Sequence, residues 1–236
     1  MDYSANIIAE EFQEHIKKSD RKDKIMRAAP VIVLFGIVLL YSVFAPGFCS
    51  AKNALVLLNQ MSIPLIVATG VTFIILIGGI DLSVNGVMGL TAAITGLLVL
   101  NDKTSFHLGI FGMIIAVLIA GLCGAITGAI FVKGKIPSFM VSFAMNSVTY
   151  GLAMLSYGAL APMIEDQTVR AIALNKVLGL PVFFYIAVAL FIVALLVQEK
   201  TAFGKYIYAI GENEGIAKQA GLNVDWIKIK VFMWSG

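Results

Sequence analysis

Charged residues are scarce in this sequence and are absent from long stretches of it. Of the 236 residues, 13% are Asp, Glu, Lys or Arg and 59% are apolar, whereas about one quarter of a soluble domain is charged. Six windows hold no charged residue, and they are 24, 28, 20, 29, 29 and 22 residues long: 28–51, 53–80, 82–101, 104–132, 136–164 and 177–198. This pattern excludes an ordinary soluble domain.

Each window is long enough to cross a membrane as a helix, because about 20 residues span a hydrocarbon core of about 30 Å. The bilayer interior has no water to satisfy peptide groups, so only helices or a closed barrel can span it. The windows lack the alternation of barrel strands. The sequence therefore predicts an all-α, polytopic transmembrane helix bundle with six full spans. The six uncharged residues after Lys230 are too few to cross a membrane, and we expect them to be a seventh span that is begun but not finished.

Basic residues predict the orientation of this bundle. Six precede the first window: Lys17, Lys18, Arg21, Lys22, Lys24 and Arg27. We expect a cytoplasmic basic leader at 1–27, followed by a transmembrane domain at 28–236. Alternating six spans from a cytoplasmic N-terminus puts eleven basic residues inside and four outside, as the positive-inside rule requires. The net charge of +3 then needs no nucleic-acid partner.

Motifs for catalysis, nucleotide binding and metal binding are also missing from the sequence. Cys49 falls in a predicted external loop and Cys123 in an apolar window, so we expect no disulfide and no metal site. No Gly-x-x-x-x-Gly-Lys-Ser/Thr loop is present to bind a phosphate, and the two histidines lie in the leader and in an outer loop. We therefore predict that the chain is not an enzyme and binds no cofactor itself.

Several spans carry residues that suggest packing or a transport path. Gly124 and Gly128 have the small-xxx-small spacing of close helix packing. Pro64 and the pair Gly78–Gly79 predict a bent or interrupted helix in window 53–80. Polar side chains inside spans usually face the bundle interior, so candidate path residues are Asn59, Gln60 and Asn146, with Ser62, Ser142 and Ser147.

The run Gly-Gly-Ile-Asp-Leu-Ser-Val-Asn-Gly at 78–86 puts Asp81 at the predicted cytoplasmic boundary. One interpretation is local structure, in which Asp81 or Ser83 accepts hydrogen bonds from the free N–H groups of the next helix. The other is contact with a substrate or a gate, and Asn85 belongs to the same candidate set.

A predicted cytoplasmic loop at 199–225 has helix signals of its own. Asn213 suits an N-cap, Glu214 suits a first turn, and Gly221 suits the position after a helix end. The result is a helix of about two turns, which is unstable alone and needs a partner surface. That surface is either the chain's own bundle or a cytoplasmic subunit, and the residues alone leave both open.

Three separated blocks in this order carry a family resemblance over roughly residues 50–236: GGIDLSV, KIPSFMVSFAMNSVTYGLAML and TAFGKYIYAIGENEGIAKQAGLNV. They resemble the permease subunits of ribose/galactose/xylose-type bacterial ABC sugar importers, in the branched-chain/monosaccharide inner-membrane translocator family. Departures include Gly215-Ile216-Ala217 where a Glu-Ala-Ala-like run is usual, and Glu212 and Asn85 where Gly is common.

The resemblance implies a bacterial inner-membrane protein with three kinds of partner besides lipid. A second permease subunit, identical or different, completes the path, and an extracytoplasmic binding protein delivers the sugar. ATP-binding cassette subunits hold ATP and Mg and dock on cytoplasmic loops. The implied ATPase-coupling residues are Gly204, Tyr208, Gly211, Asn213, Glu214, Ala217 and Gly221.

The expected function is movement of a monosaccharide or related small polar solute by alternating access. One alternative is an ion-coupled secondary transporter, against which stand the absence of mid-span charges and of an internal repeat. Another alternative is a non-transporting membrane assembly protein or an inactive fragment.

Overall fold

The computed structural model describes residues 25–26, 28–158 and 160–236. The predicted basic leader, apart from residues 25 and 26, lies outside the described residues. The chain divides into two compact units, 1–54 and 55–236. In the described part of the first unit, the helix Ala28–Phe44 leads into a turn in which the rings of Tyr41 and Phe48 stack, with centroids 5.6 Å apart.

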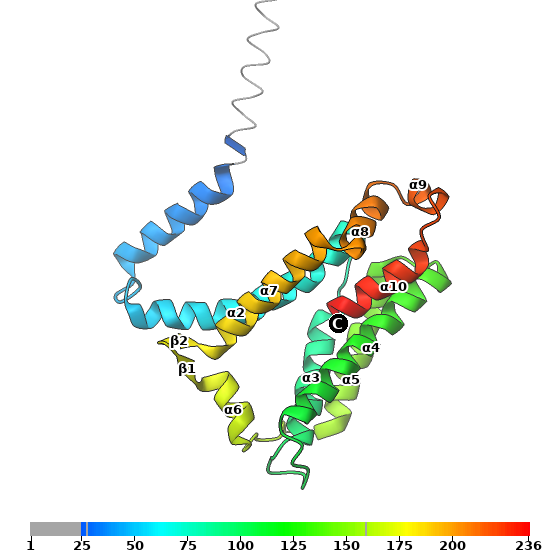
Figure 1. The fold of residues 1–236 in the computed structure, drawn as a ribbon. Coiled ribbons are helices and arrows are strands. Elements are labelled where there is room, and N and C mark those ends of the chain that lie inside the picture. Colours follow the sequence, from blue (N-terminus) through cyan, green and yellow to red (C-terminus); the bar gives the residue numbers. More distant parts are fainter. Residues whose placement is uncertain (1–24, 27, 159) are drawn as a thin grey trace, which may run out of the picture. The chain divides into compact units, whose positions relative to one another are not determined.

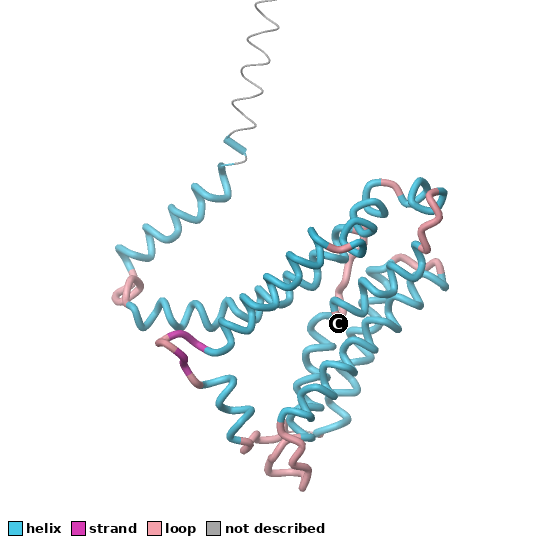
Figure 2. Tube along the Cα trace, viewed as in Figure 1, coloured by secondary structure: helices cyan, strands magenta, loops and turns pink. Residues whose placement is uncertain are grey.

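Helices dominate the described chain (Figures 1 and 2). In order they are α2 (Ala51–Leu76), α3 (Val84–Leu98), α4 (Ile110–Gly134), α5 (Ser138–Tyr157), α6 (Gln167–Leu174), α7 (Val182–Lys200), α8 (Ala202–Glu212), α9 (Glu214–Gln219) and α10 (Val224–Ser235). Between α6 and α7, the short strands β1 (Lys176–Val177) and β2 (Leu180–Pro181) pair antiparallel, with Lys176 opposite Pro181.

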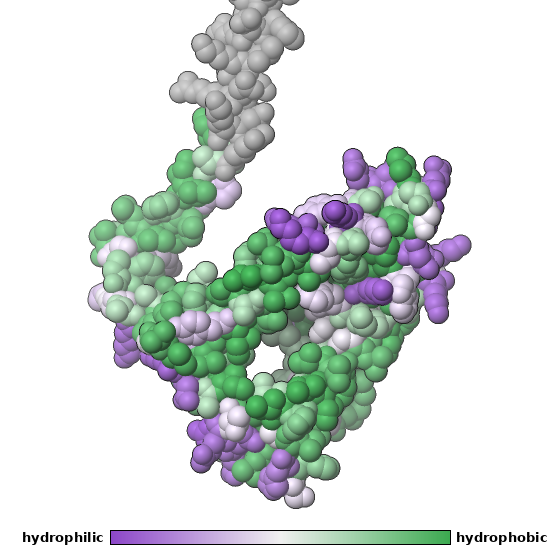
Figure 3. Space-filling view, in the orientation of Figure 1, coloured by the Kyte–Doolittle hydropathy of each residue, from purple (hydrophilic) through white to green (hydrophobic). Residues whose placement is uncertain are grey.

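Each of the six charge-free windows corresponds to one of the apolar helices, although α2, α4 and α7 extend past their windows and include Lys52, Lys133 and Lys200. Among the described residues, α2, α4, α5 and α7 are long and apolar enough to cross a membrane, and Ala28–Phe44 and α3 are shorter apolar helices. Large apolar side chains cover their outer surfaces, such as Phe111, Val117 and Leu118 on α4, which are 67–72% exposed. Apolar surface follows the helices of the second unit, and hydrophilic residues gather near their ends (Figure 3). The predicted all-α membrane bundle is confirmed.

Small residues set the closest helix packing in the second unit. α3 packs against α4 and α5, and α10 packs against α4. A Cβ added to Gly124 would lie 2.2 Å from the carbonyl oxygen of Phe232 on α10, and one added to Gly128 would lie 3.0 Å from the Cα of Ile229. The backbones of α4 and α10 therefore approach too closely for any larger residue, as the small-xxx-small spacing predicts.

α2 continues through Pro64 and stops at Leu76. Gly78 has φ +74°, and its N–H donates to the carbonyl of Ile75 while the N–H of Gly79 donates to that of Ile74, both at 2.9 Å. These two bonds form a Schellman motif, which needs a left-handed residue that glycine adopts without strain. The interruption predicted for window 53–80 therefore lies at Gly78, and the chain stays non-helical until α3 begins at Val84.

A hydrophobic core joins the second half of α2 to α7, α8, α9 and α10. The Phe73 ring lies 6.5 Å from Phe203 of α8 and 5.6 Å from Trp234 of α10, measured between centroids. The buried members of the core are Phe73, Ile74, Ile77, Ala194, Ile207, Ile210, Ala217, Val224, Ile227, Val231 and Phe232. This core supports the α8–α10 region, where all seven predicted coupling residues lie.

Candidate functional site

Helix α8 is fixed at both ends by small or capping residues. Thr201 is its N-cap and accepts from the N–H of Gly204 at 3.3 Å. At the other end, a Cβ on Gly211 would lie 1.9 Å from the carbonyl oxygen of Leu76, so glycine is required for α8 to reach the end of α2. Ile207 and Ile210 are buried, whereas Tyr206 and Tyr208 are exposed. One face of α8 thus packs into the core and the other faces outward.

Helix α9 has the boundaries that its cap residues predict. The Asn213 side chain accepts from the N–H of Ile216 at 3.0 Å, and Gly221 has φ +82°. The N–H of Gly221 donates to the carbonyl of Lys218 at 3.0 Å, and that of Leu222 donates to the carbonyl of Ala217 at 3.1 Å. This is a second Schellman motif, so the sequence-based prediction of a two-turn helix is confirmed.

The two faces of α9 differ in burial. Ala217 is buried in the core shared with α8 and α10, whereas the Ile216 side chain is 64% exposed. The bundle therefore supplies the partner surface that so short a helix needs. It leaves the Ile216 face uncovered by the described chain.

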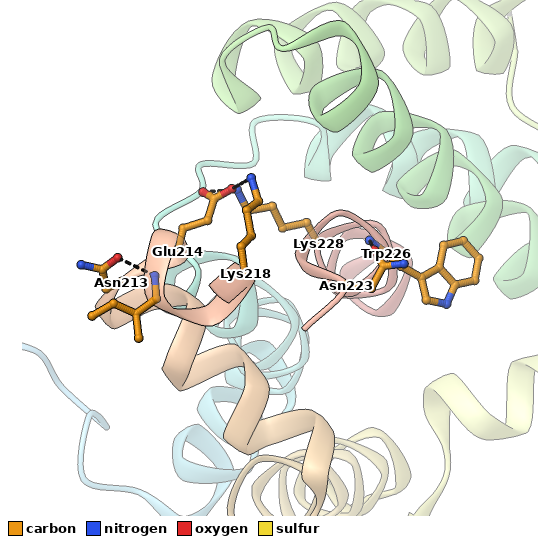
Figure 4. Close-up of polar contacts among 7 residues, drawn as sticks. Asn213, Glu214, Lys218, Asn223, Trp226 and Lys228 are labelled. Atoms are coloured by element: carbon orange, nitrogen blue, oxygen red, sulfur yellow. Dashed lines mark hydrogen bonds and ion pairs between the residues drawn. The ribbon is translucent and has the colours of Figure 1, made fainter. Parts of the chain in front are cut away.

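Glu214, the first residue of α9, binds two lysines (Figure 4). Its Oε1 lies 2.8 Å from the Nζ of Lys218, one turn along the same helix, and its Oε2 accepts from the Nζ of Lys228 on α10 at 2.7 Å. Hydrogen bonds from these ammonium groups hold the pKa of the Glu214 carboxyl below its usual value. The same contact raises the pKa of Lys218. At neutral pH this is an ionic link between α9 and α10.

A polar face of α5 holds the non-helical segment that follows α2. The Oγ of Ser138 accepts from the N–H of Ile80, and the Oγ of Ser142 accepts from the N–H of Leu82, both at 2.9 Å. Further along, the Oδ1 of Asn146 accepts from the N–H of Gly86 at 2.7 Å. Backbone that is not helical cannot lie against lipid with its polar groups unpaired. The α5 side chains meet this requirement for segment 80–86.

Asp81 acts on the residue that precedes α3. Its Oδ1 accepts from the N–H of Ser83 at 2.8 Å and from the hydroxyl of Ser83 at 2.6 Å. Ser83 is the N-cap of α3, yet its side chain makes no cap hydrogen bond to that helix. Asn146 of α5 supplies an acceptor for Gly86 in the first turn instead. The hydrogen bonds from Ser83 thus support the first interpretation of Asp81, a role in local structure.

Asp81 and Ser83 also line a pocket of about 200 Å³. Its walls come from α2, α3 and α4 and from the end of α10, and they include Val67, Thr91 and Gly124. This volume is below the roughly 300–1,000 Å³ of sites for drug-sized ligands, so the pocket suits a small solute. The polar side chains of Asp81, Ser83, Thr91 and Ser235 in a mostly apolar wall are groups that fix the orientation of a polar ligand.

The predicted site residues fall into three groups. The seven expected coupling residues lie together on α8, α9 and their ends; Gly204 and Ala217 are buried in the packing, and the other five are partly or fully exposed. Asp81 and Ser83 line the pocket, whereas Asn146 supports segment 80–86. Asn59, Gln60 and Asn85 are exposed and are not among the pocket-lining residues.

Two sets of contacts in this region were not predicted from the sequence. The pairing of Glu214 with Lys228 gave no signal, because the two residues are 14 apart on different helices and no periodic pattern relates them. The polar face of α5, in contrast, did leave a pattern in the sequence. Ser138, Ser142, Asn146 and Thr149 follow a spacing of four, four and three residues, which puts them on one side of a helix.

Comparison with known proteins identifies similar chains over most of the sequence. Residues 53–236 match the family model described as branched-chain amino acid transport system / permease component. A ribose import permease protein of Haemophilus influenzae is 38% identical over 211 residues, which cover 87% of this chain and 64% of that protein. A fructose import permease protein of Rhizobium meliloti is 32% identical over 221 residues, covering 89% and 60%.

An L-arabinose transport system permease protein of Escherichia coli K12 is 32% identical over 207 residues, which cover 87% of this chain and 62% of that protein. The chain thus spans a little under two thirds of the length of these relatives. No solved structure matches it significantly. The relatives are named as permeases and not as enzymes, in agreement with the role expected from the sequence.

Proposed function

The chain belongs to the family of branched-chain amino acid transport system permease components, and on this basis we propose that it is the membrane-spanning permease subunit of an ATP-driven importer of a monosaccharide or related small polar solute. The family description names amino acids, whereas the relatives that align with 87–89% of this chain are named for ribose, fructose and arabinose. Likeness along most of the chain to several sugar permeases favours a sugar.

One observation carries the proposal for how the chain is driven. α9 is a short helix capped at both ends, with Ala217 packed into the core and the Ile216 face exposed. A helix of six residues on a rigid support suits the transmission of a push from a docked subunit. We therefore assign α9 and its flanking residues, from Gly204 to Gly221, as the surface on which an ATP-binding cassette subunit docks.

The proposed mechanism is alternating access. The partner subunits hold ATP and Mg, and their closure moves α9 together with the α8–α10 core. Tilting of the attached helices then opens or closes the path beside Asp81 and Ser83. Docking shifts the equilibrium between the two arrangements only to the extent that it binds one of them more tightly. A second permease subunit completes the path, and an extracytoplasmic binding protein delivers the sugar.

We propose six spans and a cytoplasmic N-terminus in a bacterial inner membrane. The excess of eleven basic residues over four supports this orientation through the positive-inside rule. It puts α8 and α9 on the side where ATP is available. Neither the family match nor the named relatives favour an ion-coupled secondary transporter or a non-transporting assembly protein.

The docking surface is tested by charging its exposed apolar residue. We expect Ile216→Asp to abolish co-purification of the co-expressed ATP-binding subunit. Leu178→Asp is the matched control, because Leu178 is also an exposed aliphatic residue, 94% against 64% for Ile216, and lies near the opposite end of α7. Undiminished ATPase binding by Ile216→Asp contradicts the docking assignment. Uptake of radiolabelled ribose, fructose and arabinose into proteoliposomes containing all subunits tests the substrate class, and a lack of ATP-dependent uptake of any sugar contradicts it.

A further inference from the structure

The two lysines that bind Glu214 have very different surroundings. Lys218 lies on α9 itself, and its side chain is 54% exposed. Exposed ion pairs of this kind contribute little to stability. Lys228 lies on α10, and its side chain is 11% exposed. The contact between Glu214 and Lys228 is therefore the one that joins the docking helix to the bundle through a largely desolvated charge.

Lys228 is also held from the side of α4. Its Nζ lies 5.2 Å from the centroid of the Phe131 ring, within the range of a cation–π interaction. The Phe131 ring in turn lies 5.6 Å from the ring of Phe232 on α10. A buried ammonium that loses its carboxylate partner is strongly unfavourable. Glu214 and Lys228 therefore stay in contact when either helix moves, so that α9 and α10 move together.

Further contacts connect α10 to the pocket. α10 lies directly on Gly124 and Gly128 of α4, where added Cβ atoms would meet its backbone or the Phe232 side chain at 2.2–3.0 Å. Interfaces packed this tightly transmit displacement because they cannot be compressed. Gly124 also lines the pocket beside Asp81, as does Ser235 at the end of α10. A continuous set of contacts thus leads from Glu214 to the pocket wall.

We propose that the Glu214–Lys228 ion pair is the link that couples movement of the docking helix α9 to α10, α4 and the pocket. Glu214 and Lys228 are positioning residues in this scheme, since neither touches the pocket. The inference rests on the proposed function, because it assumes that an ATP-binding subunit pushes on α9. It adds that docking of the ATP-binding subunit alone is insufficient for transport, and that this ion pair transmits the movement of α9 to α10 and the pocket.

A purely structural pair and a coupling pair predict different kinetics. If the pair only stabilises the fold, variants that remain folded and bind the ATPase should transport normally for each ATP hydrolysed. If it couples the helices, such variants should hydrolyse ATP with less transport. The decisive quantity is the ratio of sugar uptake to ATP hydrolysis in proteoliposomes that contain the permease, its ATP-binding subunits and the binding protein.

We expect Glu214→Gln and Lys228→Gln each to lower this ratio about fivefold or more, the size of a typical coupling free energy between two sites. Lys228 lies on α10, outside the docking surface, so Lys228→Gln should leave ATPase co-purification unchanged, whereas the ratio for Glu214→Gln is measured on complexes that retain the ATPase. Lys230→Gln is the matched control: Lys230 is an exposed lysine on the same helix, placed over Trp226 and not near Glu214. It should leave the ratio within about twofold of the wild-type value.

The inference can still be tested if one of the single variants folds poorly. The double variant Glu214→Gln with Lys228→Gln leaves no unpaired buried charge, so it should fold, and complexes of it that retain the ATPase should remain uncoupled. A wild-type ratio in this double variant overturns the inference. Absence of ATP-dependent uptake by the wild-type protein is a different result, and it refutes the proposed function instead.

Discussion

The Asn146 side chain on α5 accepts a hydrogen bond from the first turn of α3. Replacing Asn146 therefore tests how the start of α3 is stabilised. Gly86 is buried and donates its N–H to the Oδ1 of Asn146 at 2.7 Å. The N-cap residue Ser83 makes no side-chain bond that would replace this contact. Asn146→Ala therefore leaves a buried donor without its partner, at a cost of about 1–3 kcal/mol.

The expected effect on thermal stability follows from this cost. For a protein of this size, 1 kcal/mol shifts Tm by about 2–4 °C, so Asn146→Ala should lower Tm by roughly 2–12 °C. Detergent-solubilised protein is heated in steps, and the folded fraction is measured by fluorescence-detected size-exclusion chromatography.

Ser147→Ala is the control for this measurement. Ser147 is exposed, and its hydroxyl donates only weakly, at 3.4 Å, to the carbonyl of Phe143 in its own helix. Surface changes of this kind alter stability by less than about 0.5 kcal/mol. Equal melting temperatures for the Asn146 and Ser147 variants would refute the idea that α5 caps α3.

Two further predictions concern the α4–α10 contact and the Glu214 pair. Gly124→Ala should destabilise the protein by about 1–3 kcal/mol, because its Cβ would lie 2.2 Å from the Phe232 carbonyl oxygen. Gly121→Ala is the control and should be tolerated, since its Cβ would lie 3.6 Å from Met233. Equal melting temperatures for the two variants would contradict the prediction. The pKa of Glu214 is lowered in the folded state by its two lysines, so the pair's stabilisation is complete above the ordinary glutamate pKa of about 4.3 and is lost as pH falls through the lowered value. The Tm difference between wild type and Glu214→Gln should thus stay constant from about pH 8 to about pH 5 and shrink below about pH 4, whereas a change between pH 5 and pH 8 would assign the effect to another group.

Local signals in the sequence were sufficient for the apolar helices and for the ends of α9, but they did not predict α6, α8 or the β1–β2 pair. Absence of charge marked each apolar helix, since one Lys or Asp in a span is costly. Asn213 and Gly221 marked both ends of α9, because capping depends on residues a few positions apart. Pro64 was less informative than Gly78. A proline inside a membrane helix is tolerated, whereas the left-handed glycine at Gly78 ends the helix.

Contacts between distant residues were not predictable in the same way. Nothing in the spacing of Glu214 and Lys228 indicates that α9 folds back onto α10. Asn146 was identified as an intramembrane polar residue, but the sequence alone did not distinguish a residue that contacts substrate from one that supports a backbone. That distinction depends on which segment lies against α5, and the pairing of Asn146 with Gly86 spans 60 residues.

The polar face of α5 also has a consequence for the order in which the chain assembles during synthesis. The amide of Ile80 bonds to a residue 58 positions later in the chain, and that of Gly86 to one 60 positions later. At roughly 5–20 residues per second, the ribosome needs about 3–12 s to add those residues. Until then, the N–H groups of Ile80, Leu82 and Gly86 lack the α5 acceptors that they have in the folded protein. Ribosome-bound chains stalled just before Ser138 should therefore exchange the Ile80, Leu82 and Gly86 amide hydrogens rapidly, and chains stalled after α5 has entered the membrane should protect them; equal protection in both would show that the segment is satisfied without α5.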